Sequence, residues 1–156
     1  MKYLTVTCLS IILLGCATGK VIIPEIQNDF KINAEYDDVW SAVIETLAEM
    51  SAPIKSIEKE SGLVTTDFVN FFSGYNQSAE LDRIAEKPNY GILASWSRGR
   101  YKFNVFVRAK DDGQTAVKIT THIEAYENII NDDWFVCHSK GVIENELFES
   151  ITSNLR

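Results

Sequence analysis

The side chains that most often carry chemistry are scarce in this chain. They are two histidines, His122 and His138, and three cysteines, of which Cys8 and Cys16 lie near the N-terminus and Cys137 lies directly before the second histidine. A cysteine with a histidine suggests a thiolate nucleophile and its base. Adjacent residues on a strand or a helix point in different directions, so Cys137 and His138 cannot form a catalytic pair by adjacency. We therefore interpret Cys137 as a small buried thiol and the two histidines as surface or capping residues.

Metal binding and hydrolysis use recognisable spacings that this sequence lacks. It contains no His-x-x-x-His pair, no closely spaced cysteines, no Gly-x-Ser-x-Gly, no phosphate-binding glycine loop and no EF-hand. The acidic pairs Asp111–Asp112 and Asp132–Asp133 are typical of turns. The sequence therefore predicts no catalytic residue, no metal and no cofactor, and a protein that is not an enzyme.

A strip of basic residues is the feature that best suggests binding. Residues 101–108 and 117–124 alternate between apolar and polar side chains, as two antiparallel strands with one buried face do. On an acidic protein, a basic strip on the open face suggests docking of an acidic partner segment or of lipid headgroups. The plainer interpretation is a solvated strand face. The candidate binding residues are Arg100, Lys102, Phe106, Arg108, Lys118 and His122.

An aromatic segment is the second candidate surface. Phe71, Phe72 and Tyr75 open a stretch, residues 71–96, that has no strand period and in which residues 78–86 could form a short helix. Connections this long are often functional, and clustered exposed aromatic side chains mark interfaces. We therefore predict that these three residues bind a partner, unless they fold over the sheet.

The N-terminal residues have the layout of an export signal. Lys2 supplies a positive charge, and residues 3–14 are apolar and uncharged. This run is too short to span a bilayer, which takes about 20 residues; the other interpretation is a strand or helix of the core. Leu13–Cys16 resembles the lipobox of bacterial lipoproteins. The resemblance implies that the signal peptide 1–15 is removed and that Cys16 carries a covalent diacylglycerol, usually with an acyl chain such as palmitate.

Lipid rather than charge is expected to hold the protein at a membrane. The formal charge is −7, and removal of the signal, whose one charged residue is Lys2, leaves −8. Such a chain is repelled by anionic headgroups and by nucleic acid, whereas two or more acyl chains give stable attachment. Ala17 follows the cysteine where Asp would signal retention, which implies the outer membrane. Residues 16–29, with Gly19 and Pro24, form the expected tether.

Two amphipathic helices are predicted in residues 30–156, which have the length of one domain. Residues 36–50 and 139–155 place apolar side chains three or four positions apart, which makes one apolar stripe along each helix. Glu144 falls off the second stripe, and Trp134 is expected to plug the core beside it. The apolar positions are Tyr36, Trp40, Val43, Leu47 and Met50 in the first helix and Ile143, Leu147, Ile151 and Leu155 in the second.

The other predicted elements are strands joined as hairpins. Ser61–Gly62 separates the first pair, in which Val64, Thr66 and Phe68 share a face, and Asp111–Gly113 separates the second. The resulting order is β-α-β-β-loop-β-β-α. It predicts an α+β domain with two helices packed on one face of an antiparallel sheet. The predicted strands are residues 30–34, 53–60, 63–70, 101–108 and 117–124.

Five short motifs carry a family resemblance: Tyr36–Trp40, Ser61–Asp67, Arg100–Tyr101, Thr115–Ile119, and Trp134–Gly141 with Glu144. Together they resemble the helix-grip domains of BamC-like lipoproteins. BamC is a lipoprotein subunit of the machinery that inserts β-barrels into the outer membrane. The resemblance implies a helix-grip fold and a non-catalytic role beside another envelope protein. This chain has room for one such domain where BamC has two, and it lacks the long N-terminal segment with which BamC grips its partner.

These features predict a lipid-anchored, non-catalytic protein-binding or envelope-assembly accessory module at the periplasmic side of the outer membrane. The expected partners are the membrane and an envelope protein, and nucleic acid is not one. The alternative is a carrier of a small apolar ligand or lipid, because helix-grip folds can hold such ligands between sheet and helix. A cavity of at least about 300 Å³ in the core would favour the carrier, whereas a filled core with an exposed basic strip would favour docking.

Overall fold

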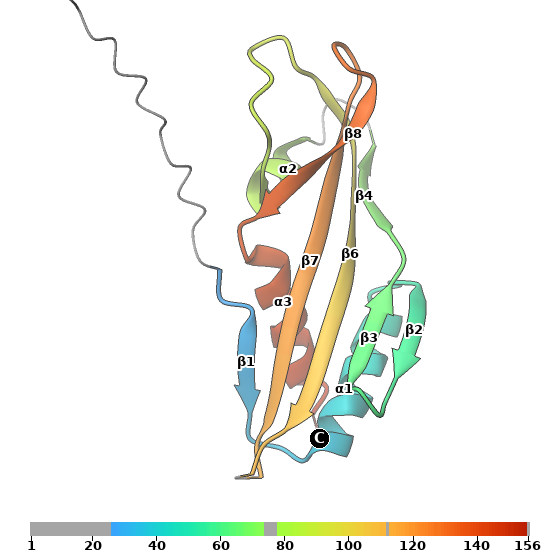
Figure 1. Ribbon diagram of the computed structural model, residues 1–156, viewed down its shortest axis with the longest axis vertical. Helices are drawn as coiled ribbons and strands as arrows, with labels where there is room; N and C mark the ends of the chain where they lie inside the picture. The colour runs from blue at the N-terminus through green and yellow to red at the C-terminus, as the bar shows by residue number, and fades with distance from the viewer. Residues whose placement is uncertain (1–25, 74–77, 112, 156) are drawn as a thin grey trace, which may run out of the picture.

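The computed structural model describes residues 26–73, 78–111 and 113–155. The predicted signal peptide 1–15, Cys16 and Tyr75 lie outside the described residues. The described part is an antiparallel sheet of eight strands with three helices on one of its faces (Figure 1). The predicted α+β class, with one covered and one open sheet face, is therefore confirmed.

A long hairpin forms the centre of the sheet. Strand β6 (Trp96–Ala109) pairs with β7 (Thr115–Glu127) from Trp96↔Glu127 to Ala109↔Thr115. The alternation of apolar and polar residues in both strands gives each hairpin arm one buried face. The two outer edges of this hairpin each take two shorter strands: β3 (Leu63–Thr66) and β4 (Val69–Ser73) pair with β6, and β1 (Asp29–Ile32) and β8 (Asp133–Ser139) pair with β7.

Two further strands complete the sheet and three helices cover it. Strand β2 (Ile54–Glu58) extends the sheet beyond β3, and β5 (Ala85–Glu86) extends it beyond β8. In Figure 1 the helices lie behind the sheet. They are α1 (Tyr36–Glu49), α2 (Ser78–Ile84) and α3 (Val142–Ser153).

The space between sheet and helices is filled by apolar side chains. Phe103 of β6 and Leu47 of α1 have no exposed surface, and neither has Leu147 of α3. Strand β1 is fastened to α3 by the stacked rings of Phe30 and Phe148, whose centroids are 4.2 Å apart. Burial of side chains of this size supplies most of the stability of a domain. Because the interior is filled, the open face of the sheet is the surface to examine for a binding site.

The sequence does not predict strand β8, and the expectation for Trp134 fails with it. Residues 133–139 pair with β7 rather than leading into the last helix. Alternation along β8 turns Phe135 and Cys137 towards the core and leaves Trp134 on the open face, so the expected core plug is wrong. His138 lies exposed on β8, opposite Glu86, in agreement with its interpretation as a surface residue.

Two other side chains take the face opposite to the one expected. Phe68 does not share the face of Val64 and Thr66, because the strand breaks at Asp67–Phe68, where β3 ends and β4 has not begun. Glu144 is fully buried, since it lies three residues before Leu147 and therefore on the same side of α3. Its carboxylate accepts a hydrogen bond of 2.8 Å from the Ser139 hydroxyl.

Candidate functional site

The six basic and aromatic residues predicted on β6 and β7 do share the open face of the sheet. Residues that oppose each other in an antiparallel pair project on the same side. Lys102 opposes His122, and Phe106 opposes Lys118. Arg100 and Arg108 lie on the same side because they have the parity of Lys102 along β6. The face away from the helices is therefore basic, as the alternation indicates.

Cations and aromatic rings alternate along the upper half of this face, in an arrangement that we call the cation–aromatic ladder. Its members in spatial order are Tyr126, Arg98, Trp134, Arg100, Phe68 and Lys102. The Arg98 guanidinium carbon lies 3.8 Å from the centre of the Tyr126 ring and 5.4 Å from that of Trp134. The Arg100 carbon lies 4.0 Å from the centre of the Trp134 ring and 4.2 Å from that of Phe68. Lys102 Nζ lies 4.9 Å from the Phe68 centre.

One carboxylate, Glu124, is built into the ladder. It accepts a hydrogen bond of 2.7 Å from Arg100 Nε, and its second oxygen lies 2.8 Å from His122 Nε2. Partial burial raises the cost of ionising Glu124, but the hydrogen bonds from His122 and Arg100 outweigh it and hold the pKa of Glu124 below its ordinary value. Glu124 is therefore a carboxylate at neutral pH and fixes Arg100 in place.

The remaining cations of this face keep their charge available. Among the residues that the structure describes, Arg98, Lys102, Arg108 and Lys118 have no carboxylate within ion-pair distance. Arg98, Arg108 and Lys118 are also exposed. A face with four such cations is electrostatically suited to an anionic group, although the whole chain is acidic.

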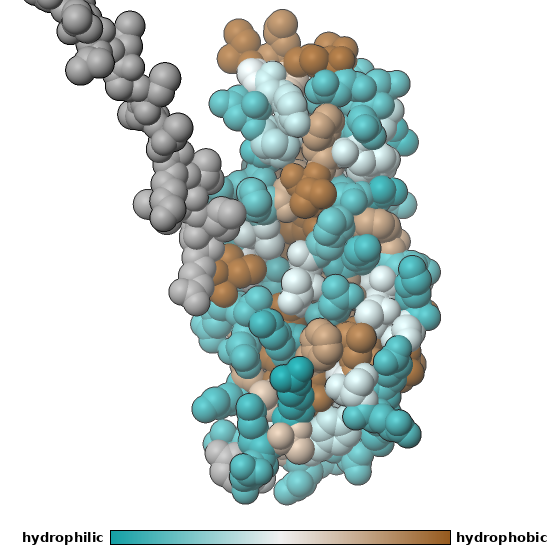
Figure 2. Space-filling model, viewed as in Figure 1, coloured by the Kyte–Doolittle hydropathy of each residue, from teal (hydrophilic) through white to brown (hydrophobic). Residues whose placement is uncertain are grey.

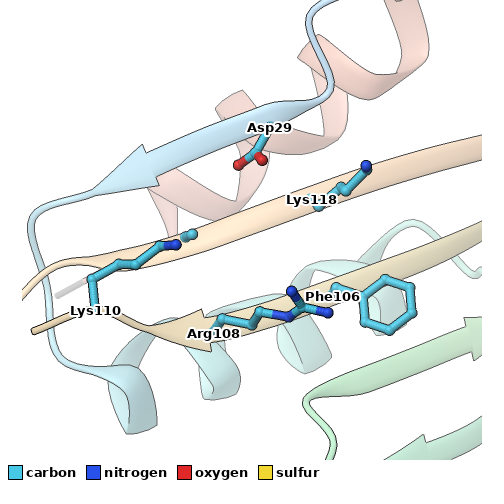
Figure 3. Close-up of a pocket in the computed structure, with 6 residues that line it drawn as sticks. Asp29, Phe106, Arg108, Lys110 and Lys118 are labelled. Atoms are coloured by element: carbon cyan, nitrogen blue, oxygen red, sulfur yellow. The ribbon is translucent and has the colours of Figure 1, made fainter.

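A pocket of about 240 Å³ lies at the lower end of the same face. Figure 3 shows its charged walls, with Asp29 on β1 and basic side chains on β6, on β7 and in the turn between them. Arg108, Lys110 and Lys118 supply three positive charges against the single carboxylate of Asp29, and Phe106 supplies an aromatic wall. The pocket extends the basic surface beyond the ladder.

Four members of the ladder were not predicted as site residues: Arg98, Phe68, Trp134 and Tyr126. Arg98 has the same parity as Arg100, but Gly99 and the irregular pairing between Trp96 and Arg98 conceal the true start of β6. Trp134 and Phe68 come from segments whose strand pairing was misjudged. Tyr126 lies two residues after Glu124 on β7 and therefore on the same face, so the alternation in the sequence could have identified it.

Phe71 of the predicted aromatic segment is not part of this face. Phe71 is partly buried against the core, and its ring centre lies 5.7 Å from that of Tyr101. Phe71 therefore packs onto the sheet, which is the alternative to partner binding that the sequence left open. The side chain of Phe72 and all of Tyr75 lie outside the described residues, as does Cys16.

Nucleophilic chemistry at Cys137 is disfavoured by its surroundings. The residue is 4% exposed, and burial raises the pKa of its thiol to about 11, so the thiol stays protonated at neutral pH. His138 projects from the other side of β8, as expected for adjacent residues. Within residues 26–73, 78–111 and 113–155, no group of three or more His, Cys, Asp or Glu side chains converges as a metal site would require.

Comparison with known proteins leaves the site to be interpreted from its own chemistry. No protein-family model matches the sequence, and no curated protein is significantly similar to it. None of the helices in the described part of the chain is long and apolar enough to cross a membrane.

Proposed function

We propose that this protein is a lipid-anchored, non-catalytic module that binds an acidic segment of another envelope protein on the open face of its sheet. The observation that carries the proposal is the cation–aromatic ladder, in which Arg98 and Arg100 are held between aromatic rings. Guanidinium groups held in this way are preorganised, so less side-chain entropy is lost when they bind a partner.

The chemistry of the ladder favours carboxylates on an extended or helical peptide. Arg98 is exposed and has no carboxylate partner among the described residues, so the edge of its guanidinium can pair with a carboxylate in a bidentate manner. Lys102 and Lys118 add charge further along the face. The rings of Trp134 and Phe68 supply apolar contact area between the cations, as the anchor residues of protein interfaces do.

The anchor supplies the second half of the proposal. A lipid on Cys16 confines the domain to a membrane surface and raises its effective concentration for membrane-bound partners. The resemblance to BamC-like helix-grip lipoproteins, an outer-membrane location and an envelope-assembly role belong to the same proposal. Burial of Phe103, Leu47 and Leu147 in a filled interior supports docking over the carrier alternative, because an apolar ligand would need the space that these side chains occupy.

Site-specific photocrosslinking in native membranes tests the proposal. A photoreactive amino acid replaces Thr120, which is exposed at the centre of the open face, and as a control replaces Glu149, which is exposed on α3. The expected result is a discrete crosslinked product from position 120, absent from position 149, whose crosslinked peptide is acidic. The product should weaken in Arg98→Gln/Lys102→Gln and persist in Lys55→Gln, which removes an exposed cation on β2. Equal products from both positions, or no dependence on the ladder cations, would contradict the proposal.

A further inference from the structure

Four aliphatic side chains are exposed together at one end of the molecule, and we call them the apolar tip. Ile92 and Leu93 are 102% and 71% exposed, in the segment between β5 and β6, and Ile129 and Ile130 are 62% and 49% exposed, in the turn between β7 and β8. Figure 2 shows hydrophobic residues gathered at this end of the molecule. Isolated exposed aliphatic residues are ordinary, but four on two neighbouring loops form a patch that marks an interaction site.

The tip is held in shape by a buried carboxylate. Glu127 has no exposed surface, and its two oxygens accept hydrogen bonds from the backbone N–H groups of Ile129, Ile130 and Asn131 at 2.7–2.9 Å. The same carboxylate accepts the N–H of Ser95 at 3.1 Å, and the N–H of Asn128 donates to the Ser95 carbonyl at 3.1 Å. These bonds join the two loops, so the exposed isoleucines are presented by a defined structure.

The composition of the tip suits a lipid surface. Residues 88–95 and 128–131 contain no charged side chain, although the whole chain has a net charge of −7. Behind the aliphatic residues lies Tyr90, whose ring is partly exposed and sits 4.6 Å from the ring of Phe135. Tyrosine with an apolar body and a polar hydroxyl is favoured at the level of lipid headgroups. These two uncharged segments are the part of an acidic protein that can approach anionic lipids at the lowest electrostatic cost, and the exposed Asp132 and Asp133 mark where the uncharged part of the β7–β8 turn ends.

The length of the N-terminal segment allows the tip and a lipid anchor to reach one membrane together. The described chain begins at Ile26, which lies against Gly141; a side chain at Gly141 would come within 3.4 Å of Ile26 Cβ. From Gly141 to Ile130 the chain runs through Lys140, β8 and the turn residues 131–132; β8 alone spans about 23 Å at about 3.3 Å for each of its seven residues, and the whole path at most about 36 Å. The ten residues from Cys16 to 25 reach at most about 33 Å. The reach of this segment is therefore comparable to the distance from Ile26 to the tip, so the anchor and the tip can meet one membrane when the segment is nearly extended.

We propose that the apolar tip inserts into the headgroup and upper acyl region of the membrane that holds the lipid anchor. This inference rests on the proposed anchoring at Cys16 and adds a second contact that sets the orientation of the domain. A bilayer adapts to projecting side chains of any shape, whereas a protein partner would need a matching cavity. With the tip in the membrane, the long axis of the β6–β7 hairpin points away from the surface and the open face stays accessible to a partner (Figure 1).

Fluorescence quenching by lipids tests the insertion. The full chain is expressed as the processed lipoprotein, and Leu93→Cys or Lys110→Cys is labelled with nitrobenzoxadiazole. Lys110 is exposed in the β6–β7 turn, at the opposite end of the hairpin. The buried Cys137 thiol should not react, and an unsubstituted chain labelled in parallel measures any background. The vesicles contain phosphatidylethanolamine, phosphatidylglycerol and a phospholipid spin-labelled near the headgroup end of its acyl chain. Mass spectrometry of the same protein detects the acyl group on Cys16.

The expected result is a blue shift and quenching of the label at position 93 and neither change at position 110. Ile129→Ser/Ile130→Ser should reduce the quenching at position 93, and Ile57→Ser, on β2, should leave it unchanged. An acylated protein whose two labels behave alike would overturn the tip inference and leave the anchor intact. A quenched label at position 93 on a protein without acyl mass would overturn the anchor and support the tip. A protein that shows no acyl mass and no quenching at position 93 would overturn both the anchor and the tip inference.

Discussion

The buried carboxylate of Glu127 and the backbone N–H of Ser95 form a hydrogen bond of 3.1 Å that joins the end of the β5–β6 segment to the β7–β8 turn. Three further N–H donors from the turn complete the coordination of the same carboxylate. Burial opposes ionisation of Glu127, but the N–H donors, that of Asn131 foremost, lower its pKa to about 2. This group decides how the apolar tip responds to acid.

Acid should loosen the tip through Glu127. In the folded protein the pKa of Glu127 lies below its ordinary value of 4.5. The stabilisation from Glu127 is therefore complete above about pH 4.5 and is lost as the pH falls towards about 2. Glu127→Gln should be less stable at neutral pH and should lose less stability than the parent between these pH values. Urea unfolding across this range measures both effects. Parallel pH profiles of the variant and the parent would contradict the role assigned to Glu127.

Removal of the Arg100 side chain should destabilise the domain as well as the site. The pair Arg100–Glu124 is largely shielded from solvent, with side-chain exposures of 29% and 15%, so Arg100→Met leaves a partly buried carboxylate with fewer donors. We expect a loss of about 1–2 kcal/mol in the free energy of unfolding. Lys55→Met is the control, because its pair with Asp67 is exposed at 3.8 Å and should cost less than about 0.5 kcal/mol. Equal losses for the two variants would show that Glu124 does not depend on Arg100.

Two glycines with positive φ provide a matched test of the hairpin turn between β2 and β3. Gly62 has φ +73°, and a Cβ there would lie 2.0 Å from the Val107 carbonyl oxygen, whereas Gly91, with φ +80°, faces open space. Gly91→Ala should cost about 1–2 kcal/mol, the backbone cost of a left-handed residue. Gly62→Ala should cost distinctly more, because β3 must move away from β6. Thermal unfolding of both variants checks the difference, and similar losses would contradict the close approach of Gly62 and Val107.

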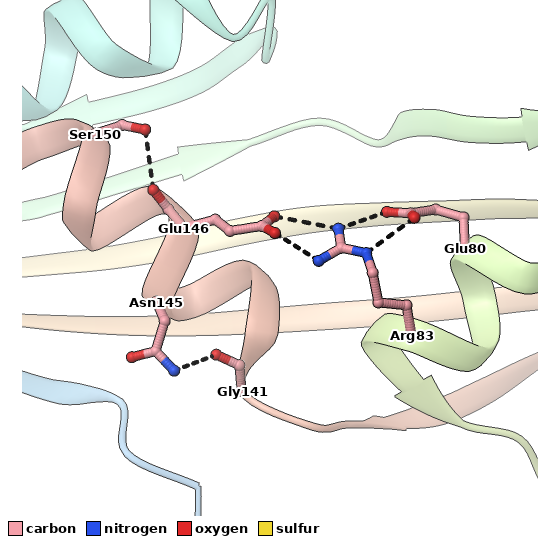
Figure 4. A network of polar contacts seen from close by, with 6 residues as sticks. All are labelled: Glu80, Arg83, Gly141, Asn145, Glu146 and Ser150. Atoms are coloured by element: carbon pink, nitrogen blue, oxygen red, sulfur yellow. Dashed lines mark hydrogen bonds and ion pairs between the residues drawn. The ribbon is translucent and has the colours of Figure 1, made fainter.

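A bridging arginine should couple α2 to α3. Figure 4 shows Arg83 between the carboxylates of Glu80 and Glu146, with N–O distances of 2.7 and 2.5 Å in the two ion pairs. The hydrogen bond from Arg83 lowers the pKa of Glu80. Because all three side chains are partly exposed, Arg83→Met should cost only about 0.5–1 kcal/mol, and less at high salt. Hydrogen exchange of α2 measures the loosening directly; unchanged protection of α2 in the variant would refute the coupling.

The elements with a strong period were predictable from the sequence. The stripe from Trp40 to Leu47 specifies α1, and the alternation around Phe103 and Ile119 specifies the central hairpin, because each pattern buries one face only in that structure. The basic strip followed from the same alternation, since parity decides the side of the sheet on which Lys102 and Lys118 lie.

The ladder was not predictable in full because it depends on pairing between distant segments. Trp134 reaches Arg100 only because β8 pairs with β7, and Phe68 reaches it only because the chain breaks between β3 and β4. Neither event has a local period. Glu144 and Glu127 show a related limit. Charged residues are expected at the surface, and the hydrogen bonds that make their burial tolerable depend on the detailed backbone geometry of a turn and of a helix start.

Whether a lipid on Cys16 holds this domain at a membrane is decided by growing cells with an alkyne analogue of palmitate and comparing the native chain with Cys16→Ser. We expect the analogue on the native protein, recovered in the membrane fraction after cleavage before residue 16, and an unlabelled, uncleaved Cys16→Ser chain. A native protein that carries no analogue and fractionates as the Cys16→Ser variant does would contradict the anchor, and with it the proposed function.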